Sequence, residues 1–214
     1  MTARVLLSFL ATAGLFYANI MPALIDGLKE ALHFTNQEAG RVGAFNMYGG
    51  AFGALLIAFA ARRIVNWRGA AQRMLVTLVV LDLVSMLVTG PAMLMAVRFV
   101  HGAVGGALVG LAFSIFARTA APDRTFGVLL LVQAGAGGAG VMSLPLLVPM
   151  FGTPILFCAL ILFNVVTLLM LQFLPAYPVV APKAETGAKC SAPFWWLCFL
   201  PVSASSSRSW AACC

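Results

Sequence analysis

Two charged side chains lie within long apolar segments of the chain, where an ionised group is costly. Asp82 precedes Gly90 by eight residues, and Arg98 follows Pro91 by seven. Insertion scales put the cost of such a charge at the centre of a membrane helix at roughly 2.5–3.5 kcal/mol, so a partner at the same depth is favoured. If Gly90 and Pro91 form a tight turn between two helices, both charges lie about 10–12 Å from it. The spacing predicts either a charged site that faces a translocation cavity or a structural ion pair.

A row of small residues with helical spacing begins at Arg98. Gly102, Gly106, Gly110 and Ser114 follow it at intervals of four residues, and Gly49 and Gly53 repeat the spacing on an earlier segment. Lipid gives no hydrophobic drive for helices to associate, so small residues promote contact by letting two backbones approach closely. We therefore expect these glycines to form a tight seam between helices.

Further polar residues interrupt the apolar segments. His101 lies within one turn of Arg98 and belongs to the one residue type that ionises near neutral pH. It either relays protons or is a hydrogen-bonded packing residue. The others are Asn19, Asn46, Gln133 and Asn164. Each of these four either lines a substrate cavity or forms hydrogen bonds between helices.

A glycine-rich run, G-A-G-G-A-G, occupies residues 135–140 and is followed by Pro145. A phosphate-binding loop of such composition requires a strand before it and the start of a helix after it. This run is embedded in apolar sequence instead. It predicts a flexible, closely packed membrane helix in which Gly135, Gly138 and Pro145 have packing or conformational roles.

Covalent catalysis within the membrane needs a nucleophile and a base at comparable depth. Ser114 and His101 are separated by about 20 Å of helical rise, so they cannot pair within one helix. No G-x-S-x-G element is present, and the five cysteines and two histidines have no metal-ligand spacing. We predict no enzyme activity, no metal and no cofactor, although an intramembrane enzyme remains one alternative.

The composition predicts that these residues lie in a membrane. The chain of 214 residues is 62% hydrophobic and 9% charged, whereas soluble domains are roughly 25% charged. A helix needs about 20 apolar residues to cross a bilayer. Segments near this length span residues 5–25, 43–61, 74–89, 92–117, 126–149 and 153–174, and the short third segment has an alternative start nearer Ala70. They predict an all-α integral membrane domain of six helices over residues 1–174. In the polar connection 26–41, Thr35 and Glu38 are expected to form a capping box at the start of the second helix.

The basic residues predict the orientation. The net charge of +7 is spread over short gaps between apolar segments, with no patch that suits nucleic acid. If six helices alternate, only Lys29 and Arg41 fall on one side. The other side receives Arg4, Arg62, Arg63, Arg68, Arg73, Arg118, Arg124, Lys183 and Lys189. The positive-inside rule then places the N-terminus in the cytoplasm. We expect the protein to lie in the plasma (inner) membrane.

The last part of the chain has a different character. Residues 175–193 are rich in proline and charge and predict a cytoplasmic linker, and residues 194–202 resemble the start of a seventh helix. A serine-rich stretch then follows. A truncated or frameshifted reading frame, or a cloning artefact, is expected to account for residues 194–214.

Three motifs point to one family. They are F-T-N-Q-E-A-G at residues 34–40 leading into N-M-Y-G-G-A-F-G at 46–53, R-F-V-H-G at 98–102, and the glycine-rich run with Pro145. Over about residues 4–175 the chain resembles the major facilitator superfamily, although the Gly-Pro pair of the antiporter motif is absent. The resemblance implies half of an alternating-access carrier, built as two inverted three-helix repeats. It also implies that Arg98 and Asn19 lie near the cavity and that Arg98 assists proton or substrate coupling.

The loop after the second predicted helix departs from the family pattern. It keeps basic residues as Arg62, Arg63 and Arg68, which the resemblance assigns to a cytoplasmic gating loop. Arg62 stands where the family has an aspartate, and Val65 stands where it has a second glycine.

These features predict a secondary transporter of a small solute, with or without protons, embedded in the lipid bilayer. The candidate substrate-binding or coupling residues are Arg98, Asn19, Asp82, His101 and Gln133. Because such a cavity needs two halves, we expect transport only when a second half or a second copy pairs with this chain. A non-transporting membrane protein, such as a pseudogene product or an assembly subunit, is the main alternative.

Overall fold

The computed structural model describes residues 2–60, 64, 66–119 and 121–173. The chain divides into two compact units, Met1–Val180 and Ala181–Cys214, and every described residue belongs to the first. Arg62, Arg63 and Val65 lie outside the described residues, as do the predicted linker at 175–193 and the tail at 194–214. The division of that last part of the chain stays a prediction.

The part of the chain that the structure describes contains seven α-helices and no strand. They are α1 (Thr2–Asn19), α2 (Met21–Leu32), α3 (Asn36–Ala60), α4 (Trp67–Leu87), α5 (Pro91–Phe116), α6 (Pro122–Phe151) and α7 (Pro154–Gln172). The helices α3 to α7 are each long and apolar enough to cross a membrane, and α1 with α2 makes a sixth span if the bent pair counts as one. The predicted all-helical membrane domain is confirmed.

The first predicted helix, over residues 5–25, is divided into α1 and α2, which differ in direction by 43°. Pro22 lies in the first turn of α2. Proline has no N–H to donate to the carbonyl of Ala18, and its ring collides with that carbonyl in a regular helix. The bend at Ile20 follows from this local clash.

The predicted polar connection over residues 26–41 is wrong, because only residues 33–35 separate α2 from α3. Its polar side chains lie on helical surface. Lys29 and Asp26, for example, form an exposed pair at 3.6 Å on α2. The helix ends at His33, whose φ of 54° is left-handed, as is common where helices stop. The loss of apolar character here is therefore not a loss of helix.

Two helices begin where a side chain caps them. At the start of α3, the Glu38 N–H donates to Thr35 Oγ1 at 3.2 Å and the Thr35 N–H donates to Glu38 Oε2 at 2.9 Å. The predicted capping box is confirmed. At the start of α4, Asn66 Oδ1 accepts from the Gly69 N–H at 3.0 Å. This cap begins α4 at Trp67, so the predicted start at residue 74 is wrong, and the alternative start nearer Ala70 is about three residues late.

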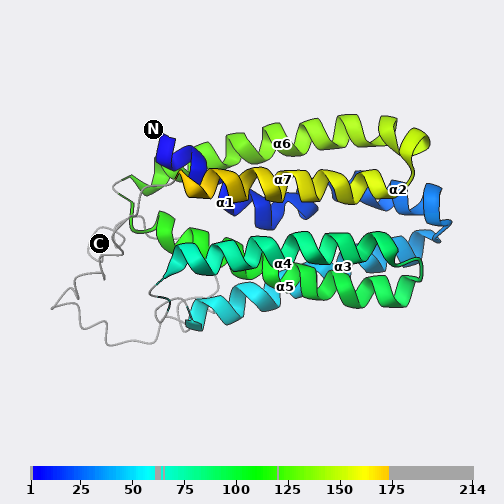
Figure 1. The fold of residues 1–214 in the computed structure, drawn as a ribbon, viewed down its shortest axis with the longest axis horizontal. Coiled ribbons are helices and arrows are strands. Elements are labelled where there is room, and N and C mark those ends of the chain that lie inside the picture. The colour runs from blue at the N-terminus through cyan, green and yellow to red at the C-terminus, as the bar shows by residue number, and fades with distance from the viewer. Residues whose placement is uncertain (1, 61–63, 65, 120, 174–214) are drawn as a thin grey trace, which may run out of the picture. The chain divides into compact units, whose positions relative to one another are not determined.

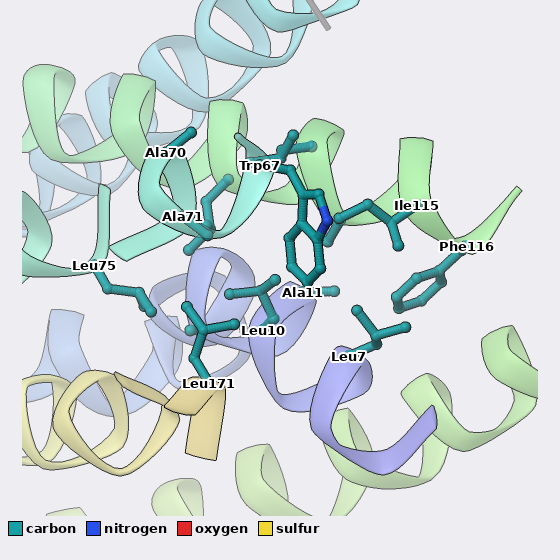
Figure 2. Packing of buried hydrophobic residues seen from close by; sticks show 14 of the residues in the cluster. Leu7, Leu10, Ala11, Trp67, Ala70, Ala71, Leu75, Ile115, Phe116 and Leu171 are labelled. Atoms are coloured by element: carbon teal, nitrogen blue, oxygen red, sulfur yellow. The ribbon is translucent and has the colours of Figure 1, made fainter. Parts of the chain in front are cut away.

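The helices of the first unit run alongside one another (Figure 1). The helices α6, α1, α5 and α3 form a series in which each packs on the next. The helices α4 and α7 pack on each other, and α4 also packs on α5 and α7 on α1. One apolar cluster joins α1, α4, α5 and α7. Figure 2 shows Trp67 of α4 in this cluster beside Ile115 of α5, with Leu10 and Ala11 of α1 facing them.

A second apolar cluster contains residues of α1, α2, α3, α5, α6 and α7. Along α4 the first cluster ends at Leu78, and the second resumes at Val88 just beyond the helix. Along α5, Leu94 belongs to the second cluster and Leu108 to the first. The interval between the two clusters therefore contains the two intramembrane charges.

Candidate functional site: a buried charge cluster

Asp82 and Arg98 form an ion pair. Arg98 Nη1 donates to Asp82 Oδ1 at 2.9 Å, and neither side chain is exposed. Gly90 caps α5 and Pro91 is its first residue, so a short turn returns the chain from α4 and brings the two charges to one level. The similar depth expected from the sequence is present, and the pair is enclosed within the bundle.

His101 joins this pair through Asn46 of α3. The Asn46 amide nitrogen donates to the Arg98 carbonyl oxygen and lies 3.0 Å from both this oxygen and His101 Nδ1. Because a carbonyl can only accept, the amide must direct its NH₂ group to this side. His101 Nδ1 is then an acceptor, and the neutral ring carries its proton on Nε2, which lies 3.3 Å from Asp82 Oδ1.

Asn164 and two aromatic rings complete the surroundings. Asn164 Nδ2 on α7 donates to Asp82 Oδ2 at 3.4 Å. The Arg98 guanidinium carbon lies 5.4 Å from the ring centre of Tyr17 and 4.8 Å from that of Phe157. Cation–π contacts at such distances favour the charged guanidinium. Arg98 Nη1 and Asn164 Nδ2 thus both face the Asp82 carboxylate as donors.

The cluster is incompletely hydrogen-bonded. Arg98 Nε and Nη2, His101 Nε2 and Asn164 Oδ1 are buried and have no hydrogen-bond partner among the described residues. The His101 Nε2–Asp82 Oδ1 contact, at 3.3 Å, is not aligned as a hydrogen bond. Unpaired buried polar atoms cost about 1–3 kcal/mol each, so a purely structural pair would favour a more complete set of partners.

The other candidate binding residues lie elsewhere. Asn19 of α1 and Gln133 of α6 line a hollow of about 490 Å³ together with Gly137 and Gly138. The Asn19 amide nitrogen is buried there without a partner in the described part of the chain. The candidates therefore form two groups, one inside the bundle and one at the α1–α6 hollow.

The seam glycines bring α3 and α5 into direct backbone contact. A methyl group at any of four of them would collide with a carbonyl oxygen of the facing helix. Gly49 and Gly53 face Phe99 and Ala103 of α5, and Gly102 and Gly106 face Asn46 and Gly50 of α3. Gly110 differs, since its nearest neighbour is the Ile57 side chain.

The glycines of α6 have a different environment. A methyl group at Gly135 or Gly138 meets nothing within 4 Å in the described bundle. Pro145 lies on the exposed surface of α6, which continues through it to Phe151. The packing role of these three residues stays a prediction, and it needs a neighbour from outside the described helices.

Arg68 holds the end of α7. Its Nη2 donates to the carbonyl oxygens of Leu171 at 3.0 Å and Gln172 at 3.3 Å, the last two residues of that helix. Carbonyls at a helix end lack partners within the helix, and a cation there is favourable. Arg68 therefore connects the start of α4 to the end of α7.

The sequence did not assign Tyr17, Asn46, Phe157 and Asn164 to this cluster. Asn46 and Asn164 are recognisable as polar residues within apolar segments, which is the signal that marks them. Tyr17 and Phe157 resemble any other aromatic core residue. Their contact with Arg98 emerges only from the packing of α1 and α7 against α5.

A protein-family model described as an uncharacterised MFS-type transporter, YbfB, matches residues 10–197. The matched range includes Asp82, Arg98 and His101, and also the seam between α3 and α5. No curated protein matches the chain.

Proposed function

Because this chain belongs to the YbfB-like family of major facilitator superfamily transporters, we propose that it moves a small solute across a membrane by alternating access. The family suggested by the sequence motifs is thereby confirmed, and the chain is a multi-pass membrane protein. The observation that best supports the proposal is the Asp82–Arg98 pair, enclosed with unpartnered polar atoms inside apolar helices. Charges at such positions typically mark substrate, ion or proton pathways.

Asp82 is the proposed proton-accepting group. Asn46 donates to His101 Nδ1, which carries no proton in the neutral ring. A second proton added to the ring would bind to Nδ1 and face the Asn46 donor. His101 is therefore expected to stay neutral and to present its Nε2–H to Asp82. Protonation of Asp82 would remove the negative charge that holds Arg98. The released guanidinium, with Nε and Nη2 already unpartnered, would then interact with the solute or with other polar groups.

The proposed architecture has two inverted repeats, α1 to α4 and α5 to α7, with the N-terminus in the cytoplasm and the protein in the plasma (inner) membrane. The distribution of basic residues supports this orientation. A second half or a second copy is proposed to pack on α6. The uncovered glycines Gly135 and Gly138 and the exposed side chains of Leu131 and Met142 support that surface.

Uptake by reconstituted protein tests the proposal. The purified full chain is placed in liposomes with an imposed pH gradient, and uptake is measured for a panel of labelled amino acids, sugars, organic acids and amines. We expect gradient-driven uptake of at least one class, and loss of the gradient dependence in Asp82→Asn. No uptake of any class, with or without a co-expressed second half, contradicts the proposal. Robust uptake by a demonstrated monomer contradicts the requirement for a second half or copy.

A non-transporting membrane protein is the second candidate. The observation that favours it is the complete burial of Asp82 and Arg98, which suits a purely structural ion pair. Under this alternative, Asp82→Asn lowers thermal stability and changes no transport property.

A further inference from the structure

A slot lies between α1 and α3, with α5 as its floor, and shares only Asn46 with the charge cluster. Both helices approach the α5 backbone closely, Gly14 against Gly105 and Gly50 against Gly106. Between these two approaches a cavity of about 210 Å³ remains. Its wall on α3 includes Ala51, which is exposed, so the slot opens at the surface of the described bundle.

Asn46 supplies the polar chemistry of the slot. It is the one polar side chain among the lining residues, all of which the structure describes, and none of them is charged. The Asn46 side chain is 4% exposed, and its NH₂ group is directed to Arg98 O and His101 Nδ1. Its amide oxygen accepts no hydrogen bond from the described residues. The slot therefore has one polar side chain in an otherwise apolar lining, and the amide oxygen of that side chain is free to accept a hydrogen bond.

We propose that this slot is a solute subsite for a compact, uncharged group that carries an N–H or O–H donor, which hydrogen-bonds to Asn46 Oδ1. The inference rests on the proposed transport function and adds the class of solute. The cavity is smaller than the roughly 300–1,000 Å³ of typical ligand pockets. It therefore fits one small end of a solute, such as a primary amide or an alcohol on a short carbon chain.

The lining disfavours charged groups. An ion moved out of water into the slot would lose hydration and meet no counter-charge, and this desolvation is costly for ammonium and carboxylate alike. A lipid acyl chain, by contrast, would leave the Asn46 oxygen without a donor. An uncharged donor group is the class that satisfies both the apolar wall and the acceptor.

Binding of three probes of similar size tests the subsite. Butanamide, n-butylammonium and butyrate are titrated against the purified full chain in lipid nanodiscs, and binding is followed by saturation-transfer NMR with empty nanodiscs as the blank. We expect saturable binding of butanamide and at least tenfold weaker binding of the two ions. Equal binding of all three, or preference for either ion, overturns the proposal.

Variants locate the binding. Asn46→Ala is expected to weaken butanamide binding about 2- to 10-fold, the effect of one hydrogen bond. Ala51→Leu fills the slot and should abolish binding, whereas Ala58→Leu, an exposed position of α3 outside the slot, should leave it unchanged. Gly50→Ala is a milder filling variant, since its methyl group lies 3.8 Å from Gly102 O without a clash. Unchanged binding in Asn46→Ala and Ala51→Leu overturns the assignment.

The uptake assay separates this inference from the proposed function. If butanamide binding follows the variants but no solute is transported, the subsite stands and the transport proposal fails. If uptake occurs and is unaffected by Ala51→Leu, transport stands and the subsite fails. Native mass spectrometry that finds a phospholipid retained by the wild type and lost in Ala51→Leu assigns the slot to lipid and overturns the proposal.

Discussion

Replacing Asp82 by alanine is expected to destabilise the bundle strongly, because the Arg98 guanidinium then lies buried without a counter-charge. The two groups are 2.9 Å apart, and neither is exposed. At an effective dielectric constant of about 20, unit charges at this distance attract by about 6 kcal/mol. Desolvation of both groups offsets part of this attraction. Deleting one member of such a pair costs about 3–5 kcal/mol.

Thermal unfolding of the purified chain in detergent, followed by tryptophan fluorescence, measures this loss. At roughly 2–4 °C per kcal/mol, the unfolding midpoint of Asp82→Ala should fall by about 6–20 °C. A second substitution, Arg98→Met, removes the unpaired charge and keeps an apolar side chain of comparable length. The double variant is expected to recover most of the lost stability, because apolar replacement of a whole buried pair is often neutral.

The matched control is an exposed ion pair on α2. Asp26→Ala removes the partner of Lys29, which lies 3.6 Å away with 66% of the Asp26 side chain exposed. Exposed pairs contribute at most about 1 kcal/mol, so the midpoint should move little. If Asp82→Ala shifts the midpoint no more than this control, the buried pair is refuted. A double variant less stable than Asp82→Ala would refute it equally, since the two residues would then act independently.

Three further contacts give predictions that the same unfolding assay checks. Gly106→Ala should lose about 1–3 kcal/mol through its clash with the Gly50 carbonyl. Gly138→Ala, with no described neighbour, should be neutral or slightly stabilising in the chain without a partner on α6. Arg68→Ala should cost about 1–2 kcal/mol and speed proteolysis at the end of α7, whose last carbonyls it leaves unpaired. Thr35→Ala should cost about 0.5–2 kcal/mol and speed hydrogen exchange in the first turn of α3. Wild-type behaviour in any variant expected to lose stability, or a clear loss in Gly138→Ala, contradicts the contact that it tests.

The Asp82–Arg98 ion pair could be predicted from the sequence, but most of the side chains around it could not. Asp82 and Arg98 stand at nearly equal distances from one turn, so helical rise alone sets their depth. Asn46 and Asn164 reach the pair across 52 and 82 residues of sequence separation, from Arg98 and Asp82 respectively. At such sequence separations, the rotation of each helix about its own axis decides which side chains meet. That rotation is fixed only by the packing of all the helices.

The glycines show the same limit at finer scale. Gly49 and Gly50 are adjacent and chemically identical, yet a methyl group at the first collides with the α5 backbone and one at the second has room. Four-residue spacing predicts that a seam exists. It does not show where the seam opens into a slot, because that depends on how α1 approaches α5 from the other side. Helix ends were missed for another reason, namely that polar residues of α2 and α4 continue the helix beyond its apolar stretch.

The geometry around Asp82 suits a two-state element. Arg98 Nη1 and Asn164 Nδ2 both direct hydrogens at its oxygens, so α5 and α7 each donate a hydrogen bond to α4 here. A proton on either oxygen would add a donor where donors already point. The nearby acceptor without a partner is Asn164 Oδ1, and turning this amide over would bring it to the new proton. Protonation would thus exchange one hydrogen-bonded arrangement of α4, α5 and α7 for another, and the proposed cycle needs a difference of this kind if protons are to shift the population of its two access states.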